Sequence, residues 1–452
     1  MKIVTYRITI CLFFLQLFYL SVPTLAQSNM ISGYTLAIDS QGLMIRSVLQ
    51  DGQPGEIIAT LDGFTLENQF KADLNLYGEM IFALSPDAKT LAFIVWQDDM
   101  SGSLLLLDVT TGIYEQQTLT NPIEQAYSVS WSPDSTKLFI ILDIDNALIY
   151  DVVSGKVIYT LNETASLPLW LPDSQQFIYI GPSTCRAALC RTWSDLYLVD
   201  LKTSSQTALT HIDADKIGLV DKLNHLPLLA HHAIYVPDDE MIYFILSEAE
   251  DGPIDIVLLA SVDLQGNMQI EADIYDMYPD SFFMDVHNIF YDEDNKHINT
   301  VVTSEGDVPY RWSILQYTPS NELEVLYERS FETSEVEIIT SMAVSPDGNR
   351  IAIGGSYPNM GSTTVVDLLS GEILWQNNDL DGVCNIHWAD IDSIFFSQPD
   401  YSCPMLRRNT RFDQLFYHNI SKSIDSLVVN SQQNEYMYFA SVFPEIPTYP
   451  QN

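Results

Sequence analysis

Short apolar runs alternate with polar turns along most of the chain. One unit recurs: an apolar run, a Ser-Pro-Asp-like turn, and a second apolar run. It is clearest at residues 81–87 followed by 91–95, and again at residues 342–348 followed by 351–353. Apolar runs of this length, bounded by Gly, Pro, Asp and Ser, are typical of β-strands and not of amphipathic helices. The pattern therefore predicts an all-β chain built from hairpins.

The recurring turn has a physical basis. Proline presets the first central position of a type I turn, and Asp accepts hydrogen bonds from nearby backbone N–H groups. Gly or Asn then permits a left-handed conformation. Two of the seven copies lack the proline, and we assign a structural role in the turn to the aspartate of each copy: Asp87, Asp134, Asp173, Asp238, Asp294, Asp347 and Asp390. Their average spacing is about 50 residues, near the usual period of a β-propeller blade.

Each copy continues into a third strand that ends at an Asp and a small turn, as in residues 104–112 and 363–371. The Ser-Pro-Asp-Gly hairpin and the later Asp-x-x-(Ser/Thr)-Gly turn resemble the WD40-like (PD40) repeats of the TolB-like propeller superfamily. The resemblance covers roughly residues 78 to 430 and implies four-stranded blades. It is informative about fold and not about function. TolB also has an α/β domain before its propeller. We expect no counterpart of that domain here, so its envelope role does not carry over.

The repeats predict a closed ring. Seven full repeats begin near residues 78, 125, 165, 231, 285, 338 and 382. Three strand-like runs precede them, at residues 34–38, 43–48 and 57–61, and one follows at residues 436–442. Sharing one blade between the two ends would close the ring and leave no free edge. We expect eight blades, with seven as the alternative, in one domain at residues 27–443 followed by a tail at residues 444–452.

The N-terminus predicts export. Lys2 and Arg7 precede an apolar run at residues 8–22, and residues 23–26 end in a cleavage site with small side chains. An uncleaved anchor is the alternative, but the run is short for a membrane span of about 20 residues. We therefore expect a signal peptide at residues 1–26, a secreted or periplasmic protein, and no membrane insertion after cleavage.

Four cysteines remain once Cys11 leaves with the signal. An even number in an exported protein indicates disulfides, and three pairings are open. Proximity in sequence favours Cys185 with Cys190, and Cys384 with Cys403. Neither pair has the C-x2-C spacing of a zinc site, and no His stands at a ligand-like offset, so no metal is expected.

The chain is strongly acidic. It has 60 acidic and 20 basic residues, a net charge of −40, and loss of Lys2 and Arg7 makes it −42. Such a surface repels nucleic acid and anionic lipid. The simplest interpretation is solubility outside the cell; a cationic partner, divalent cations or a saline habitat are alternatives. Acidic segments such as residues 292–295 lack the spacing of an EF-hand. We expect no cofactor, with calcium as the alternative.

Three histidines fall where innermost strands should begin: His231, His232 and His287. Innermost strands of a propeller line its channel, so these residues are candidates for a metal or acid–base site at the channel mouth. An ordinary polar strand start is the simpler interpretation. Because neighbours in a strand point to opposite faces, His231 and His232 are expected to point apart and not to bind one ion.

Recognisable catalytic signatures are missing. The chain has no G-x-S-x-G elbow, no H-E-x-x-H pair and no glycine-rich phosphate loop. Our first hypothesis is a monomeric, non-enzymatic propeller that binds a protein, peptide or glycan through rim loops or the channel mouth. The alternative is a channel-mouth hydrolase or lyase acting on polysaccharide or peptide. A third hypothesis is a purely structural module.

Overall fold

The computed structural model describes most of the chain between residues 30 and 441. The described residues are 30–38, 40, 42–62, 64, 81–96, 102–118, 128–143, 146–163, 166, 168–182, 194–212, 228–248, 256–306, 310–319, 321–331, 338–356, 361–380, 383, 385–398, 414–430 and 436–441.

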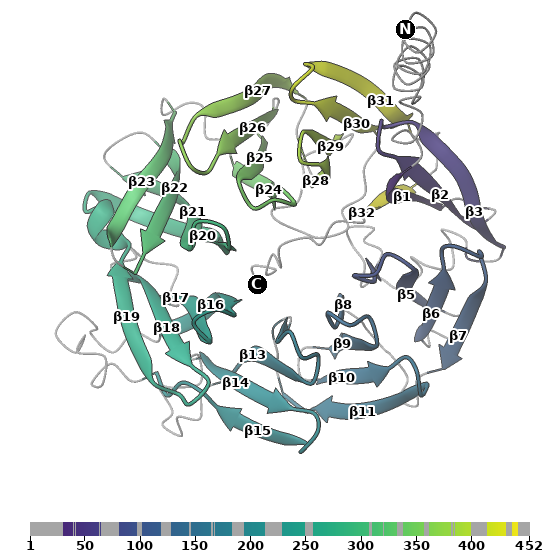
Figure 1. The fold of residues 1–452 in the computed structure, drawn as a ribbon, viewed down its shortest axis with the longest axis horizontal. Helices are drawn as coiled ribbons and strands as arrows, with labels where there is room; N and C mark the ends of the chain where they lie inside the picture. The colour runs from purple at the N-terminus through teal and green to yellow at the C-terminus, as the bar shows by residue number, and fades with distance from the viewer. Residues whose placement is uncertain are drawn as a thin grey trace, which may run out of the picture.

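Eight four-stranded antiparallel sheets stand as blades around a central channel (Figure 1). Blade 1 has the strand order β3-β2-β1-β32, and blades 2 to 8 each use four consecutive strands. Outside the strands, the described residues contain the short 3-10 helix η2 (Tyr275–Met277). No helix among the described residues has the length and apolarity needed to cross a bilayer. The expected all-β class and the preferred count of eight blades are confirmed.

The first four blades contain sixteen strands. Blade 1 consists of β1 (Ile31–Ile38), β2 (Gly42–Leu49), β3 (Pro54–Asp62) and β32 (Tyr436–Ser441). Blade 2 consists of β4 (Phe82–Leu84), β5 (Thr90–Trp96), β6 (Gly102–Asp108) and β7 (Tyr114–Thr118). Blade 3 consists of β8 (Ser128–Trp131), β9 (Lys137–Asp143), β10 (Asn146–Asp151) and β11 (Lys156–Leu161). Blade 4 consists of β12 (Leu169–Trp170), β13 (Gln176–Pro182), β14 (Ser194–Asp200) and β15 (Ser205–Ala208).

The other four blades follow the same plan. Blade 5 consists of β16 (Leu228–Val236), β17 (Met241–Glu248), β18 (Val257–Asp263) and β19 (Met268–Asp273). Blade 6 consists of β20 (Ser281–Asp292), β21 (His297–Gly306), β22 (Arg311–Thr318) and β23 (Asn321–Ser330). Blade 7 consists of β24 (Ile338–Val344), β25 (Arg350–Ser356), β26 (Gly361–Asp367) and β27 (Ile373–Leu380). Blade 8 consists of β28 (Asn385–Asp390), β29 (Ser393–Gln398), β30 (Gln414–Asn419) and β31 (Ile424–Asn430).

The two ends of the chain close the ring in blade 1. Its innermost strand, β32, pairs antiparallel with β1, with Tyr438 opposite Leu36. Tyr438 is fully buried, and its ring meets that of Phe82 in blade 2 edge to face, with centroids 6.2 Å apart. The predicted blade shared between the two ends of the chain is therefore confirmed.

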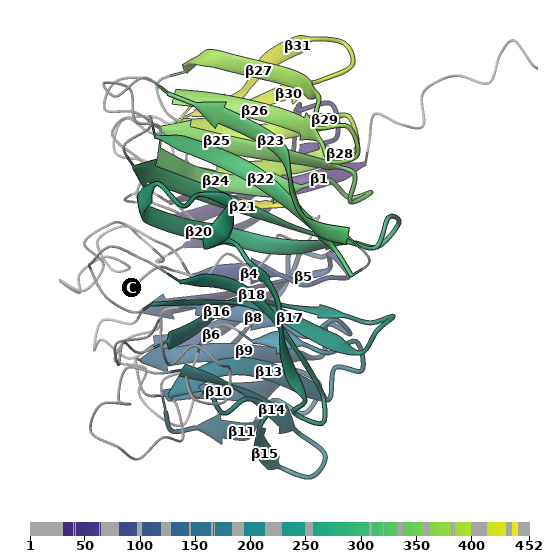
Figure 2. The same cartoon turned by 90° about the vertical axis from the view of Figure 1, so that its left-hand side faces the viewer.

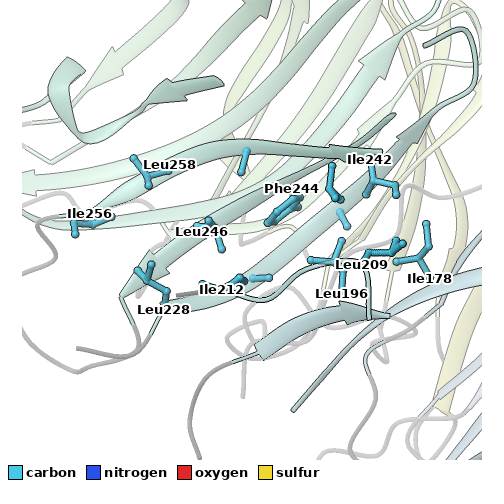
Figure 3. Close-up of a cluster of buried hydrophobic side chains, with 14 of the residues drawn as sticks. Ile178, Leu196, Leu209, Ile212, Leu228, Ile242, Phe244, Leu246, Ile256 and Leu258 are labelled. Carbon is cyan, nitrogen blue, oxygen red and sulfur yellow. The ribbon is translucent and has the colours of Figure 1, made fainter. Parts of the chain in front are cut away.

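The core lies between blades. Figure 3 shows one such contact, where Leu196 and Leu209 of blade 4 meet Phe244 and Leu246 of blade 5. Each sheet is covered on both faces by its two neighbours, so both faces of its strands must be apolar. This explains why the strands read as continuous apolar runs and not as a regular alternation.

Two tryptophans also join neighbouring blades through hydrogen bonds. The Trp131 indole donates to the Ala83 carbonyl of the preceding blade at 2.9 Å, and the Trp388 indole donates to the Ala343 carbonyl at 3.0 Å. Both tryptophans stand just before the first turn of their blade. Each hydrogen bond satisfies an indole N–H group, whose burial without an acceptor would lower the stability of the fold.

The topology gives the ring two different faces. The first and second strands of a blade, and its third and fourth strands, connect at one face, which we call the turn face. The second and third strands, and successive blades, connect at the opposite face, which we call the loop face. Seen from the edge of the ring, the strands run between these two faces (Figure 2). Each innermost strand of blades 2 to 8 therefore begins at the loop face and ends at the turn face.

Candidate functional site

The predicted turn aspartates lie at the turn face. In blade 2, Ser85 Oγ donates to Asp87 Oδ1 at 2.6 Å, and Asp87 Oδ1 also accepts from the Lys89 main-chain N–H at 3.2 Å. Burial raises the pKa of Asp87, but the hydrogen bonds from Ser85 and Lys89 outweigh it, and the pKa is lowered. Asp134 and Asp347 sit in the same arrangement, accepting from Ser132 at 2.7 Å and Ser345 at 2.5 Å. The residue after each aspartate is left-handed, with φ of 55° at Ala88, 59° at Ser135 and 73° at Gly348.

The other aspartates vary. Asp173 Oδ1 accepts from the backbone N–H groups of Gln175 and Gln176 at 2.9 and 3.0 Å. Asp390 Oδ1 accepts from the backbone N–H of Asp392 at 2.8 Å. Asp238 forms an ion pair with Lys296 of blade 6.

In blade 6 the turn carboxylate is Asp292, and Asp294 does not occupy its place. Asp292 Oδ1 accepts from the backbone N–H groups of Asp294 and Asn295, both at 3.0 Å. Asp292 is fully buried, whereas Asp294 is exposed. This copy lacks the proline, and Asp292 stands at the position that serine occupies in the Ser-Pro-Asp copies. Its carbonyl accepts from the Lys296 main-chain N–H at 2.9 Å, and Lys296 is the left-handed residue, with φ of 60°.

Adjacent turns are also bonded to each other. The main-chain N–H of Asp87 donates to Ser135 Oγ of the next blade at 3.1 Å, and that of Asp134 donates to Ser174 Oγ at 3.0 Å. These contacts hold blades 2, 3 and 4 together at the turn face. The turn aspartates therefore act within the scaffold and do not converge on the channel histidines.

The channel histidines lie at two interruptions of the β-ladder. In β16 the pairing passes from His231 opposite Ile245 to Ile234 opposite Tyr243, so His232 and Ala233 share one partner position. In β20 it passes from Val286 opposite Val302 to Asn288 opposite Val301, so His287 is the extra residue. Two neighbouring innermost strands thus each carry a β-bulge with a histidine. Bulges are common beside functional sites, where they redirect a side chain.

The prediction that His231 and His232 point apart is wrong. Their ring centroids are 4.7 Å apart, with the planes at 57°. Ala230 and Ala233 both pack into the core between blades 4 and 5, which leaves the two histidines together on the other side. The extra residue breaks the regular alternation. His232 is left-handed, with φ of 52°, a strained conformation for a residue other than glycine.

Polar contacts connect two of the histidines to the second strand of their own blade, β17 or β21. His231 Nε2 lies 2.8 Å from Ser247 Oγ, and His287 Nε2 lies 3.1 Å from Thr303 Oγ1. His287 Nδ1 lies 3.9 Å from Asp285 Oδ2. We refer to His231, His232, Asp285 and His287 as the channel-edge cluster.

The cluster also joins blades 5 and 6. The His232 ring hydrogen-bonds to the backbone of Val286, and it interacts electrostatically with His287. His231 likewise interacts with Asp285. The side chain of His287 is 6% exposed, while that of Asp285 is 26% exposed. The Asp285 carboxylate is therefore in contact with solvent, whereas the neighbouring His287 ring is almost wholly buried.

Burial keeps the three imidazoles neutral at physiological pH. It lowers the pKa of His231 to about 4, although the Asp285 carboxylate acts in the opposite direction. Burial and the neighbouring His231 and His287 rings lower the pKa of His232 well below its ordinary value. Burial also lowers the pKa of His287, again against Asp285. Each neutral ring can therefore both donate and accept hydrogen bonds without carrying positive charge.

The structure adds Asp285, Ser247 and Thr303 to the residues proposed from sequence. Asp285 could have been suspected, because it precedes His287 by two residues at the expected start of a channel strand. Nothing in the sequence marks Ser247 or Thr303. Among the described side chains, no three His, Cys, Asp or Glu residues are arranged to hold a metal ion.

The four cysteines predicted to form disulfides, Cys185, Cys190, Cys384 and Cys403, lie outside the described residues. So do the proposed signal peptide at residues 1–26 and the proposed tail at residues 444–452. Both disulfides stay predictions.

No protein-family model matches the sequence, and no curated protein matches it. Solved structures do resemble it in fold. One is described as a prolyl endopeptidase, with a TM-score of 0.52 and 12% identity over 81% of this chain and 51% of that chain. This chain therefore spans about half the length of that peptidase.

Two further structures match over most of their own length. An oligogalacturonate lyase in complex with manganese has a TM-score of 0.50 and 15% identity, over 92% of this chain and 98% of that chain. Sqt1 of Saccharomyces cerevisiae has a TM-score of 0.51 and 11% identity, over 79% of this chain and 87% of that chain. At these identities the likeness shows fold alone, and the fold of this chain is an eight-bladed β-propeller.

Proposed function

We propose that this protein is an exported, non-enzymatic binding propeller whose ligand contacts the channel-edge cluster. One observation carries the proposal: two neighbouring innermost strands interrupt their ladders, and each places a histidine at the interruption. The strained φ of His232 supports it, because strained residues persist where the surroundings hold them and often serve function.

The ring is asymmetric at the same place. The innermost strands β16 and β20 have nine and twelve residues, whereas β12 has two and β4 has three. Closing the ring does not by itself require innermost strands of such different lengths. The longer strands give blades 5 and 6 a more extended ordered channel wall, on which a ligand can rest.

The exposed apolar side chains do not favour the structural-module hypothesis. Among the described residues they lie mostly on the outermost strands and on many different blades, as with Ile158 on β11, Ile270 on β19 and Ile424 on β31. A contiguous apolar patch would be expected for a module that packs into a larger assembly.

The ligand classes and the setting follow from the sequence. We propose a protein, peptide or glycan ligand, no nucleic-acid partner, a monomeric state, and no cofactor, with calcium as the alternative. The signal-like N-terminus supports a secreted or periplasmic location, and the cysteine spacing supports two disulfides. The Ser-Pro-Asp hairpins support placing the repeats in the TolB-like superfamily.

A ligand screen tests the binding role. Mature protein is screened by thermal shift against peptides, glycans and calcium, and each hit is titrated by calorimetry. We expect the affinity for the true ligand to fall at least about tenfold in His287→Asn. His297→Asn is the matched control, because His297 begins β21 of the same blade at the turn face. Equal binding by wild type and His287→Asn would refute the assigned site.

The rival function is a hydrolase or lyase at the channel mouth, acting on polysaccharide or peptide. It is favoured by the neutral His231 and His287 beside the Asp285 carboxylate, a set that could exchange protons with a substrate. Mass spectrometry of each hit after incubation decides between the two. Products that disappear in His287→Asn would establish the enzyme and contradict the non-enzymatic proposal.

A further inference from the structure

The bulge in β20 has two places where it could lie. Val286 and Ile289 both pack into the core between blades 5 and 6, whereas a regular strand turns residues three apart to opposite sides. One extra residue must therefore stand between them, and either His287 or Asn288 would serve. In the structure His287 is the extra residue, and Asn288 stands in the ladder opposite Val301.

The place of the bulge sets the direction of the His287 ring. Residues opposite each other in a ladder have their side chains on the same face of the sheet, and Val301 packs into the core between blades 6 and 7. If Asn288 were the extra residue, His287 would stand opposite Val301, and its ring would turn toward that core. It would then turn away from His232 of blade 5, with which it now interacts. Whatever keeps the bulge at His287 therefore also places its ring in the channel-edge cluster.

The peptide group that follows Asn288 is held at both ends by side chains. Asn288 Oδ1 accepts a hydrogen bond from the Ile289 main-chain N–H at 2.8 Å, and the Thr300 hydroxyl donates to the Asn288 main-chain carbonyl at 2.8 Å. This N–H and this carbonyl belong to one peptide group. Thr300 stands opposite Ile289 on β21, so the second bond ties the first peptide after the bulge to the neighbouring strand.

Asn288 is an expensive residue at this place. Its side chain is almost wholly buried, and within the described part of the chain its Nδ2 amide group has no hydrogen-bond partner. Burial of an amide with an unmet donor lowers stability, so an apolar side chain would be more stable here. A buried group of this kind calls for an explanation, and the hold of its Oδ1 on the Ile289 N–H supplies one.

We infer that Asn288 and Thr300 are positioning residues, which hold the peptide between Asn288 and Ile289, keep the bulge at His287, and so place the His287 ring in the channel-edge cluster. The inference rests on the proposed function for the role of His287 in binding. An asparagine beside a histidine does not mark a bulge in a sequence, because the pair acts only once β20 and β21 have paired.

Removal of one hydroxyl tests the inference with little change in side-chain size. Thr300→Val deletes the donor to the Asn288 carbonyl, and Thr300→Ser retains it. The readout is the NMR spectrum of the free protein labelled at the imidazole carbons of histidine. We expect the His287 resonances to shift or split in Thr300→Val and to stay close to their wild-type positions in Thr300→Ser. The resonances of His418 in blade 8 should not move in either variant.

Thr363→Val is the matched control. Thr363 is fully buried on β26 of blade 7, and among the described residues its hydroxyl has no hydrogen-bond partner. Its loss should leave the His287 resonances in place. Asn288→Leu removes the acceptor for the Ile289 N–H and should move the His287 resonances as Thr300→Val does. This second variant decides the matter if Thr300→Val does not fold.

Unchanged His287 resonances in Thr300→Val and Asn288→Leu would overturn the inference, and so would an equal displacement in Thr300→Val and Thr363→Val. The proposed function is judged separately. If the His287 resonances move as expected but no ligand from the screen depends on His287, the positioning stands and the binding role fails. If a ligand depends on His287 and the resonances do not move, the binding role stands and the positioning fails.

Discussion

His232 shows how one inserted residue changes the chemistry of a strand. A regular β16 would send the rings of His231 and His232 to opposite sides, whereas the bulge brings their centroids to 4.7 Å. Burial then matters more than the nearby carboxylate, since the pKa of His231 is lowered to about 4 despite Asp285. Buried, neutral imidazoles lower the free energy of unfolding in acid, because the histidines of the unfolded chain bind protons more readily than those of the folded chain.

This predicts an acid sensitivity with a definite sign. The folded-state pKa of His231 lies below that of the unfolded chain, so its stabilising effect is complete above about pH 6.5 and is lost as the pH falls toward 4. Between pH 7 and pH 5, His231 should account for a loss of about 2 kcal/mol in the free energy of unfolding. Urea denaturation of wild type and His231→Asn at both pH values measures it.

The variant should lose less stability between pH 7 and pH 5 than wild type, by roughly that amount. A pH dependence in His231→Asn as steep as that of wild type would show that His231 is not buried in neutral form.

At the scale of strands and turns, local chemistry made most elements predictable. Proline and Asp in residues 85–87 and 345–347 specify their turns through contacts within five residues, so sequence alone suffices. The bulges at His232 and His287 are different. Nothing local marks them, because they depend on how β16 and β20 pack between their neighbours. The site therefore could be predicted as histidines on channel strands, but not as a cluster.

Blade 6 offers a direct test of the turn assignment. Asp292 is buried and accepts two backbone hydrogen bonds and one from the Asn295 amide, whereas Asp294 is exposed. We expect Asp292→Ala to lower the free energy of unfolding by about 2–3 kcal/mol, because several bonds to a charged acceptor are lost. Asp294→Ala should change it by less than about 0.5 kcal/mol. Equal effects of the two substitutions in chemical denaturation would contradict the observed turn.

At the scale of the whole molecule, stability depends on closure. The innermost strand of blade 1 comes from the end of the chain, and its three partners come from the beginning. Because the core lies between blades, separating two neighbouring blades would expose an apolar face on each of them. The closure could be predicted because three strands before the repeats and one after them favoured a shared eighth blade, although seven blades remained the alternative.

Tyr438 tests closure. It is fully buried between β1 and Phe82, so Tyr438→Ala should lower the free energy of unfolding by about 3–5 kcal/mol, as for other large buried aromatic residues. Tyr114→Ala is the matched control, because Tyr114 is 44% exposed on an outermost strand. It should cost less than about 1 kcal/mol. If both variants unfold like wild type in denaturant, β32 does not hold the ring closed.

The claim that a ligand meets the channel-edge cluster is tested most directly by NMR of the histidine rings. Spectra of protein labelled at the imidazole carbons are recorded with and without saturating ligand from the screen. We predict that the resonances of His231 and His287 shift on binding, while those of His297 and His418 stay in place. Shifts confined to histidines outside the cluster, with His231 and His287 unchanged, would contradict it.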